Sequence, residues 1–436
     1  MTESLDLAGI GIGPFNLSLA AQLDSIAGPE VRFFDRKPQF AWHPGMMLPG
    51  VELQTSFLKD LVMATNPTSP WSFIAYLVAH KRFYEFLNAD FEAVPRREFA
   101  RYLAWVAENL PTLHFGREVR EVSFDGEFFK LSFDSEERLA RNLSLGVGLA
   151  PHIPAWAEPV MGDRAFHSSE AAYILDNIEG RRIMVVGGGQ SGAEIVLNLL
   201  LNAPAGTEIS WISRRPNFQP LDDTPFTNEL FTPNYVERFH ALAEPRRRAT
   251  VAHQKLAGDG ISTSTLCAIY RRLYELRHLS VEGPQTNLLP HREVLDLAQE
   301  GDEMRFVMRN GFDGGIETLD ADALVLATGY SFALPECLSP LGERLALDEN
   351  GLPRLAADFS IQWDGPADCR IFALNAGRFS HGIAEPQLSL MAWRSAMIVN
   401  ALMGQRHFDL EHPAHFMYWT GEDNRAQPAG ASALRA

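Results

Sequence analysis

Two glycine-rich segments constrain the fold of this chain more than any other feature. Residues 5–20 and 181–194 each read as a short apolar strand, a glycine turn and the start of a helix with apolar periodicity. Glycines in such a turn permit a tight bend and a close backbone approach, and the helix N-terminus attracts a pyrophosphate group. The sequence therefore predicts an α/β fold with two Rossmann-like dinucleotide-binding domains.

The first motif carries Gly11 for the tight turn and Gly13 for the approach of the phosphates. Pro14 follows directly, and Asn16 stands where the third glycine of the motif usually lies. The next apolar strand ends in Asp35, at about the spacing expected of a carboxylate that binds the ribose hydroxyls. We predict that these residues contact the first dinucleotide. A glycine-rich turn without a ligand is the alternative.

The second motif has Gly187, Gly189 and Gly192 in full G-x-G-x-x-G spacing. The strand that follows it ends in Arg214 and Arg215, where an NAD site would carry an acid. Because a guanidinium group pairs with the 2′-phosphate, the predicted hydride donor is NADPH. The alternative is that the two arginines are a solvated strand end.

The length of 436 residues predicts two or three domains, since single hydrophobic cores rarely grow so large. We predict an FAD-binding domain formed by residues 1–180 and 328–436. An NADPH-binding domain, residues 181–215 and 281–327, would be inserted in it. Residues 216–280, where proline-rich turns lead into helical patterns, would form a small helical substrate-binding subdomain.

Two apolar segments are candidates for the crossings between these domains. Residues 323–330 read as a buried strand that runs into a Thr-Gly turn, and chains with two dinucleotide folds often return to the FAD domain through such a strand. Thr328 and Gly329 are therefore predicted FAD contacts. Residues 143–148, with Pro151 soon after, would mark the outward crossing.

Composition limits the partners. The chain has 38 basic and 55 acidic residues and a net charge of -17, which disfavours nucleic acid and anionic membranes and suits a cationic small substrate. The N-terminal segment is acidic and rich in glycine, so we expect neither a signal peptide nor a membrane span. Three distant cysteines without a Cys-x-x-Cys pair indicate a reducing compartment and exclude a dithiol reductase. We expect a cytoplasmic protein.

The chain resembles the microbial N-hydroxylating flavoprotein monooxygenases of siderophore biosynthesis, especially the branch that acts on lysine and diamines. The segments that carry the resemblance are Gly11–Asn16, Trp42–Met46, Phe57–Val62, Asn66–Pro70, Gly187–Gly192, Phe231–Pro233 and His381–Arg394. The resemblance implies that NADPH reduces FAD, that O2 forms a C4a-hydroperoxyflavin, and that a neutral primary amine attacks its distal oxygen. It also implies a homo-oligomer, a dimer or tetramer, and no metal ion.

The same resemblance implies roles for cofactor-binding residues. Gln54 would act beside the flavin as the catalytic residue, although it could also end a strand in solvent. The remaining residues expected at the cofactors through this resemblance are Trp42, His43, Val119 and Leu388 for FAD and Gln190, Ser191 and Arg214 for NADP.

For the substrate, the resemblance implies that Lys59 and Asn228 grip the distal end and that Leu388 and Ser389 lie at the reacting end. Each has an ordinary alternative. Lys59 could be a surface lysine, Asn228 could cap a helix, and Ser389 could bond to its own helix backbone.

The identity of the amine depends on residues 256–261. Ornithine hydroxylases carry an asparagine there, in an Asn-x-Ser context, which this chain lacks. Asp259 adds a negative charge in the same segment, which would favour an ammonium group over a carboxylate at the distal end. The resulting hypothesis is a diamine, cadaverine or putrescine, with L-lysine as the alternative. Asp259 could also be an ordinary turn residue before a helix. A hypothesis of another class is an NADPH-dependent electron-transfer flavoreductase that serves a protein partner.

Overall fold

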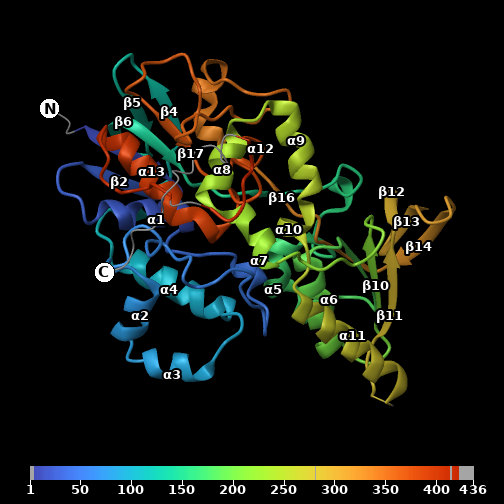
Figure 1. The fold of residues 1–436 in the computed structure, drawn as a ribbon. Helices are drawn as coiled ribbons and strands as arrows, with labels where there is room; N and C mark the ends of the chain where they lie inside the picture. Colours follow the sequence, from blue (N-terminus) through green and yellow to red (C-terminus); the bar gives the residue numbers. More distant parts are fainter. Residues whose placement is uncertain (1–3, 280, 413–414, 422–436) are drawn as a thin grey trace.

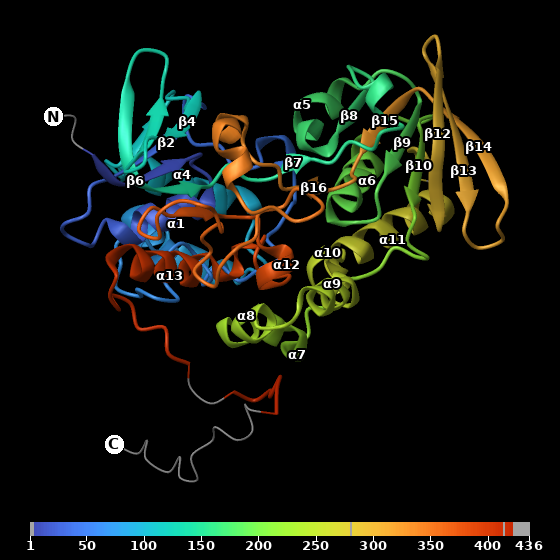
Figure 2. The same ribbon diagram turned by 90° about the horizontal axis from the view of Figure 1, so that it is seen from above.

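The computed structural model describes residues 4–279, 281–412 and 415–421. Its chain forms two α/β halves that lie side by side, each built on its own sheet (Figure 1, Figure 2). The expected mixed α/β fold is therefore confirmed.

The first half is built on a sheet with the strand order β3-β2-β1-β6-β5-β4, in which β17 also pairs with β6. Its strands are β1 (Leu5–Ile10), β2 (Val31–Asp35), β3 (Leu113–Phe115), β4 (Glu121–Phe124), β5 (Phe129–Ser132), β6 (Glu137–Leu145) and β17 (Ile371–Ala373). β1, β2, β3, β6 and β17 pair in parallel, whereas β4 and β5 form an antiparallel hairpin. Apolar side chains cover both faces of β1, as expected for a parallel sheet.

Three long helices pack in the core on one face of this sheet: α1 (Pro14–Leu23), α4 (Arg96–Asn109) and α13 (Met391–Met403). Every residue of α1 after Pro14 is buried, including the polar residues Asn16, Ser18 and Gln22, whose side chains form hydrogen bonds within the protein. α4 begins after Pro95 and buries Phe99, Leu103 and Val106 on one face, as the periodicity of residues 96–110 predicts. These helices fix the loop between β1 and α1.

The second half has a parallel sheet with the order β11-β10-β9-β15-β8. Its strands are β8 (Ala165–His167), β9 (Arg182–Val186), β10 (Glu208–Ser213), β11 (Gln285–Pro290) and β15 (Ala323–Leu326). α6 (Gln190–Asn202) and α11 (Thr263–His278) share a core on one face. An antiparallel sheet of β12 (Arg292–Glu300), β13 (Glu303–Asn310) and β14 (Ile316–Ala321) covers the other.

The boundary expected at residue 180 is wrong for β8. This strand lies within residues 1–180, yet it pairs with β15 in the second sheet. The chain crosses earlier, at β7 (Ala150–Pro151), which pairs antiparallel with β16 (Tyr330–Ser331). A three-residue strand is too short to show periodicity, so only its pairing assigns it to a sheet.

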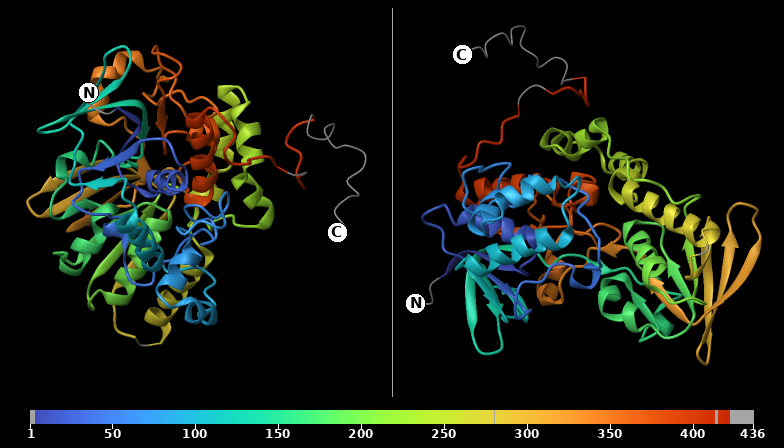
Figure 3. Two further views of the ribbon diagram at one scale, coloured as in Figure 1. Left: turned by 90° about the vertical axis from the view of Figure 1, so that its left-hand side faces the viewer. Right: turned by 90° about the horizontal axis from the view of Figure 1, so that it is seen from below.

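Of residues 216–280, those that the structure describes, 216–279, are mostly helical, as expected, but their apolar side chains join two existing cores. The elements are α7 (Pro225–Asn228), α8 (Pro233–His240), α9 (Glu244–His253), α10 (Lys255–Asp259) and α11. Tyr235, Phe239 and Val251 pack in a core of the first half, whereas Ile269 packs in the second. Figures 2 and 3 show this segment running along one side of both halves.

Shorter helices complete the described chain. They are α2 (Phe73–Ala79), α3 (Phe83–Ala89), α5 (Ala171–Ile174), α12 (Arg378–His381), and the 3-10 helices η1 (Pro44–Met46), η2 (Glu158–Val160), η3 (Ser168–Glu170), η4 (Leu175–Asn177), η5 (Glu229–Phe231), η6 (Glu336–Arg344) and η7 (Leu388–Leu390). Within the described residues, no helix is both long and apolar enough to cross a membrane.

Candidate active site

The first glycine loop, between β1 and α1, is closed by contacts within the chain. Gly11 has a φ of 83°, and a Cβ there would lie 2.7 Å from the carbonyl oxygen of Gly146. Asn16 is fully buried: its Nδ2 donates to the Gly11 carbonyl oxygen at 2.7 Å, and its Oδ1 accepts from Ser144 Oγ at 2.5 Å. The Asn16 side chain therefore braces the loop through bonds within the protein, and its expected contact with the dinucleotide stays a prediction.

Neither the backbone conformation nor the packing of the protein requires a glycine at positions 13 and 189. They precede α1 and α6 with φ values of -98° and -110°, which any residue adopts. A Cβ would come no closer than 3.5 Å to Gly146 O at Gly13, and 3.9 Å to Asp259 O at Gly189. No side chain caps either helix, so the amides of both first turns can bind an anion. Each loop thus has a cradle that fits a pyrophosphate, one for FAD and one for NADPH.

Two further glycines of the second motif serve packing. Gly187 has a φ of 139°, and a Cβ there would lie 2.0 Å from the carbonyl oxygen of Ala327. A Cβ at Gly192 would lie 2.1 Å from the carbonyl oxygen of Gly187. These contacts hold α6 against β9 and β15. The Ser191 hydroxyl has no hydrogen-bond partner among the described residues, so it can bind a phosphate beside Gly189.

The two arginines at the end of β10 have different environments. Arg215 donates through Nη1 to the carbonyl oxygens of Gly188 at 3.2 Å and Asp259 at 3.0 Å, and desolvation lowers its pKa. Its guanidinium group therefore holds the second glycine loop. Arg214 is exposed and pairs with none of the described side chains. Of the two, Arg214 is the group that can meet a 2′-phosphate.

Asp35, expected at the ribose, ties the first glycine loop to the end of β2. Its Oδ2 accepts from the backbone N–H of Ile12 at 2.7 Å, and its Oδ1 accepts from that of Lys37 at 2.8 Å. Lys37 Nζ lies 3.4 Å from Oδ2. Asp35 therefore orients the loop through the same carboxylate that the sequence assigns to the cofactor.

Trp42 and His43 lie together near the start of α4. Their ring centroids are 5.4 Å apart, and the Trp42 ring meets Phe99 at 5.9 Å. His43 reaches the surface, yet desolvation by the surrounding protein, with the positive charges of Arg96 and Lys37, lowers its pKa to about 4. The ring is therefore neutral at pH 7.

Three other expected FAD contacts use their side chains or carbonyls within the protein. Thr328 Oγ1 donates to the carbonyl oxygen of His152 at 2.5 Å. Gly329 has a φ of 88°, and its carbonyl oxygen accepts from the His167 ring at 3.0 Å. Val119 is buried in a core beneath the first sheet. Thr328 and Gly329 thus fix the crossing between the halves.

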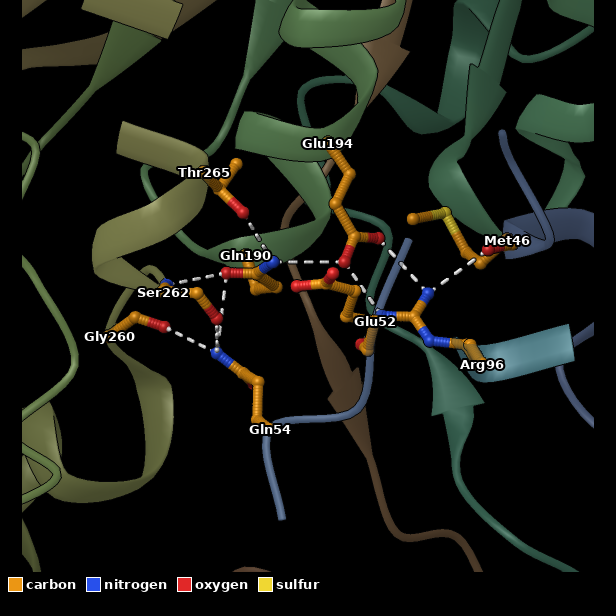
Figure 4. Close-up of polar contacts among 9 residues, drawn as sticks. All are labelled: Met46, Glu52, Gln54, Arg96, Gln190, Glu194, Gly260, Ser262 and Thr265. Atoms are coloured by element: carbon orange, nitrogen blue, oxygen red, sulfur yellow. Dashed lines mark hydrogen bonds and ion pairs between the residues drawn. The ribbon is translucent and has the colours of Figure 1, made fainter. Parts of the chain in front are cut away.

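Gln54 stands where the two halves meet (Figure 4). Its Nε2 lies 3.3 Å from Gln190 Oε1, 3.4 Å from the carbonyl oxygen of Gly260 and 3.2 Å from Ser262 Oγ. Gln190 also accepts from the backbone N–H of Ser262 at 2.8 Å and donates to Glu194 at 2.9 Å. The Gln190 amide, expected at NADP, is thus engaged within the protein.

Lys59 follows Gln54 on the same loop and is partly buried. Desolvation lowers the pKa of its ammonium group, which forms neither an ion pair nor a hydrogen bond with any described residue. Asn228, at the end of α7, is exposed and donates through Nδ2 to the carbonyl oxygen of Asp223 at 3.2 Å. It caps no helix N-terminus with its side chain. A partly desolvated cation without a partner favours an anionic ligand.

Asp259 does not present a free negative charge. Its Oδ2 lies 2.8 Å from Nη2 of Arg378, and Lys255 and Arg215 lie close enough for electrostatic interaction with this carboxylate. The Asp259 carboxylate is therefore paired with a cation, and its expected attraction for an ammonium group of the substrate stays a prediction. The sequence could not reveal this ion pair, because its partners are far apart in the chain.

Leu388 and Ser389 lie in η7, next to a buried ion pair. The Ser389 hydroxyl is buried without a hydrogen-bond partner among the described residues, so it does not bond to its own helix backbone. Arg394 Nη1 lies 2.7 Å from Glu385 Oε1, and both side chains are almost fully buried. This pair fixes the segment that carries η7, and Ser389 leaves one polar atom for a ligand.

Sequence reasoning missed several residues at this site, notably Arg96, Glu194 and Arg378. Glu194 gives one signal, since it is an acid between apolar residues at the start of a buried helix. Its partner Arg96 comes from the other half, so the pairing emerges only in the fold. Within the described ranges, no cluster of three or more His, Cys, Asp or Glu residues could hold a metal ion.

Comparison with known proteins identifies the family. A family model described as L-lysine 6-monooxygenase/L-ornithine 5-monooxygenase matches residues 3–332. The L-lysine N6-monooxygenase of Escherichia coli is 42% identical over 422 residues, covering 96% of this chain and 99% of that protein.

Solved structures agree. The FAD-bound cadaverine monooxygenase of the desferrioxamine pathway from Erwinia amylovora has a TM-score of 0.90 and 31% identity, covering 95% of this chain and 98% of that one. The ornithine N-hydroxylase of Kutzneria sp. 744, solved with reduced FAD, NADP+ and L-ornithine, has a TM-score of 0.85 and 29% identity, covering 92% and 99%. These matches confirm the expected cofactors, FAD and NADPH, and favour monooxygenation over electron transfer to a protein. The chain belongs to the lysine and ornithine N-monooxygenase family, and it is an N-hydroxylating flavin monooxygenase of siderophore biosynthesis.

Proposed function

We propose that this enzyme hydroxylates the side-chain amine of L-lysine, with NADPH and O2 as co-substrates. The observation that carries the proposal is Lys59, a partly desolvated ammonium group without a partner among the described residues. L-Lysine brings a carboxylate to its distal end, which a diamine lacks. A charge-assisted hydrogen bond from Lys59 to that carboxylate would compensate the desolvation of both groups.

The charges around Asp259 support the same choice. Arg378 pairs with this carboxylate, and Lys255 lies close enough to interact with it electrostatically. A diamine would bring a second ammonium group into a positive region, whereas an amino acid also brings a negative charge. The similarity to the Escherichia coli lysine enzyme points in the same direction.

At the reacting end, the proposal places the amine beside Ser389 and Gln54. When bound, FAD supplies the electron transfer from NADPH to O2 that the protein itself cannot perform. The buried Ser389 hydroxyl would hydrogen-bond to the amine and orient it. Gln54, held by Gln190 and Ser262, would offer its amide to the reacting atoms.

A diamine is the second candidate. It is favoured by the close match in fold to the cadaverine monooxygenase of Erwinia amylovora, at a TM-score of 0.90. In that case Lys59 would face the second amine of the substrate, which would have to be uncharged or bridged by water.

The test compares four amines, L-lysine, L-ornithine, cadaverine and putrescine, by mass spectrometry of the hydroxylamine products and by steady-state kinetics. We expect L-lysine to lead, and Lys59→Met to raise its KM about tenfold or more while changing that of cadaverine little. Lys130→Met removes a lysine that pairs with Asp125 on the hairpin of β4 and β5, and serves as the control. A higher kcat/KM for cadaverine, or an equal effect of Lys59→Met on both substrates, would contradict the proposal.

The proposal includes a cytoplasmic dimer or tetramer. All three cysteines, Cys267, Cys337 and Cys369, are free, which suits a reducing compartment. Light scattering of the purified protein would give its mass, and a monomer at working concentration would contradict the assembly.

A further inference from the structure

One ion pair joins the two halves beside the second glycine loop. Arg96, at the start of α4 in the first half, meets Glu194 on α6 with Nη2 to Oε1 at 2.7 Å and Nη1 to Oε2 at 3.0 Å. Only 14% of the Arg96 side chain and 4% of the Glu194 side chain are exposed. Arg96 also donates to the carbonyl oxygen of Met46 at 3.0 Å. The guanidinium group is thus anchored on one half and clamps the other (Figure 4).

Glu194, held by Arg96, in turn fixes the side chain of Gln190, which lies one turn earlier on α6. Gln190 Nε2 donates to Glu194 at 2.9 Å, and Gln190 Oε1 accepts from the backbone N–H of Ser262 at 2.8 Å. The carboxylate can only accept and the backbone N–H can only donate. The Gln190 amide therefore has one allowed orientation, and a flipped amide would lose both bonds.

The orientation of Gln190 in turn fixes that of Gln54. Because Gln190 presents its oxygen, Gln54 must present its nitrogen, and Nε2 lies 3.3 Å away. The Gly260 carbonyl oxygen, 3.4 Å from the same nitrogen, demands a donor as well. The Gln54 carbonyl oxygen is then left as an acceptor, and no described residue donates to it.

We propose that Arg96, Glu194 and Gln190 are positioning residues that lock the NADPH half onto the FAD half and set the amide of Gln54 for the reaction. The inference rests on the proposed place of Gln54 beside the flavin. It holds for whichever amine is the substrate. A buried ion pair adds little net stability on average, so its value here is the fixed relation of two halves that must align two cofactors.

The test measures coupling, the amount of hydroxylamine formed per NADPH oxidised, with the best of the four amines. Glu194→Gln keeps the size of the side chain but removes its charge and its purely accepting character. Gln190→Ala leaves the ion pair of Arg96 and Glu194 intact and removes the amide that connects Glu194 to Gln54. We expect both variants to lower coupling about threefold or more, with the missing product appearing as hydrogen peroxide, because small misplacements at a reacting centre are costly.

Two comparisons separate positioning from general damage. Glu317→Gln breaks the ion pair of Arg292 and Glu317, 3.1 Å apart in the antiparallel sheet, and should leave coupling unchanged. The double variant Arg96→Met with Glu194→Gln should couple no worse than either single variant, because both break one contact. The flavin absorbance of each variant gives its concentration of FAD-bound enzyme, to which the measured rates are normalised.

Coupling that stays at the parent value per bound flavin in Glu194→Gln and Gln190→Ala would overturn the proposal, as would an equal loss in Glu317→Gln. Coupling loss at a normal rate of flavin reduction would support it. A changed order of the four amines with normal coupling would bear on the substrate proposal alone.

Discussion

At the scale of single residues, the two cradles rest on glycines that the protein alone does not require. A Cβ at Gly189 would meet Asp259 O at 3.9 Å, an ordinary contact, whereas one at Gly192 would lie 2.1 Å from Gly187 O. The two positions look alike in the sequence motif. They differ in what a Cβ atom would meet. Gly189 leaves open space that a ligand can fill, whereas Gly192 allows a close backbone contact that the fold needs.

Gly189→Ala should therefore fold normally and bind NADPH poorly. We expect its KM for NADPH to rise about tenfold or more, since a methyl group would occupy the place of a phosphate oxygen, while its flavin content stays normal. Gly192→Ala is the matched variant, and it should lower the thermal midpoint by crowding α6 against the loop. Steady-state kinetics and thermal unfolding would check both. An unchanged KM in Gly189→Ala would place the phosphates elsewhere.

At the scale of elements, the short helix α12 depends on a neutral histidine. His381 is buried, its ring stacks on Phe359 at a centroid distance of 4.1 Å, and the ring of His240 lies 4.6 Å away. Desolvation, with the nearby His240, lowers its pKa well below the ordinary 6.5. The unfolded chain therefore takes up a proton near pH 6.5 that the folded chain refuses, and stability falls as the pH decreases below that value.

His381→Gln should flatten this acid dependence. The free energy of unfolding, measured in urea between pH 5 and pH 7.5, should decrease less on acidification in the variant than in the parent. The slopes of this free energy against pH should differ by the equivalent of up to one bound proton. Both proteins should share a similar slope above pH 7, where the imidazole is neutral in either state. A variant as sensitive to acid as the parent would show that His381 is not the titrating group.

Elements with strong local signals could be predicted from the sequence. Residues 96–110 show apolar periodicity after Pro95, and α4 spans Arg96–Asn109. β8 could not be predicted, because three residues carry no period and its partner β15 lies far along the chain. The same distinction between local signals and long-range contacts holds for the site. Gly13 and Gly189 stand out in the sequence, whereas the ion pairs of Asp259 with Arg378 and of Glu194 with Arg96 are products of the fold.

At the scale of the molecule, each half carries its own nucleotide loop. FAD and NADP+ should then stabilise the protein separately, each by about 2.7 kcal/mol at a free concentration of 100 times its Kd. Gly13→Ala should lose the response of the thermal midpoint to FAD and keep the response to NADP+, and Gly189→Ala should do the reverse. Loss of both responses in either variant would show that one cofactor cannot bind without the other.

The paired crossing strands β7 and β16 have a consequence for how such a chain can be rebuilt. The polypeptide leaves the first half and re-enters it at neighbouring points, where the His152 backbone N–H donates to the Gly329 carbonyl oxygen at 2.9 Å. Everything between these residues is a cassette with adjacent ends. A nucleotide-binding cassette from a relative could be grafted at these two positions without stretching the remaining chain, if it also supplies the apolar side chains of α8 and α9 that complete the core of the first half.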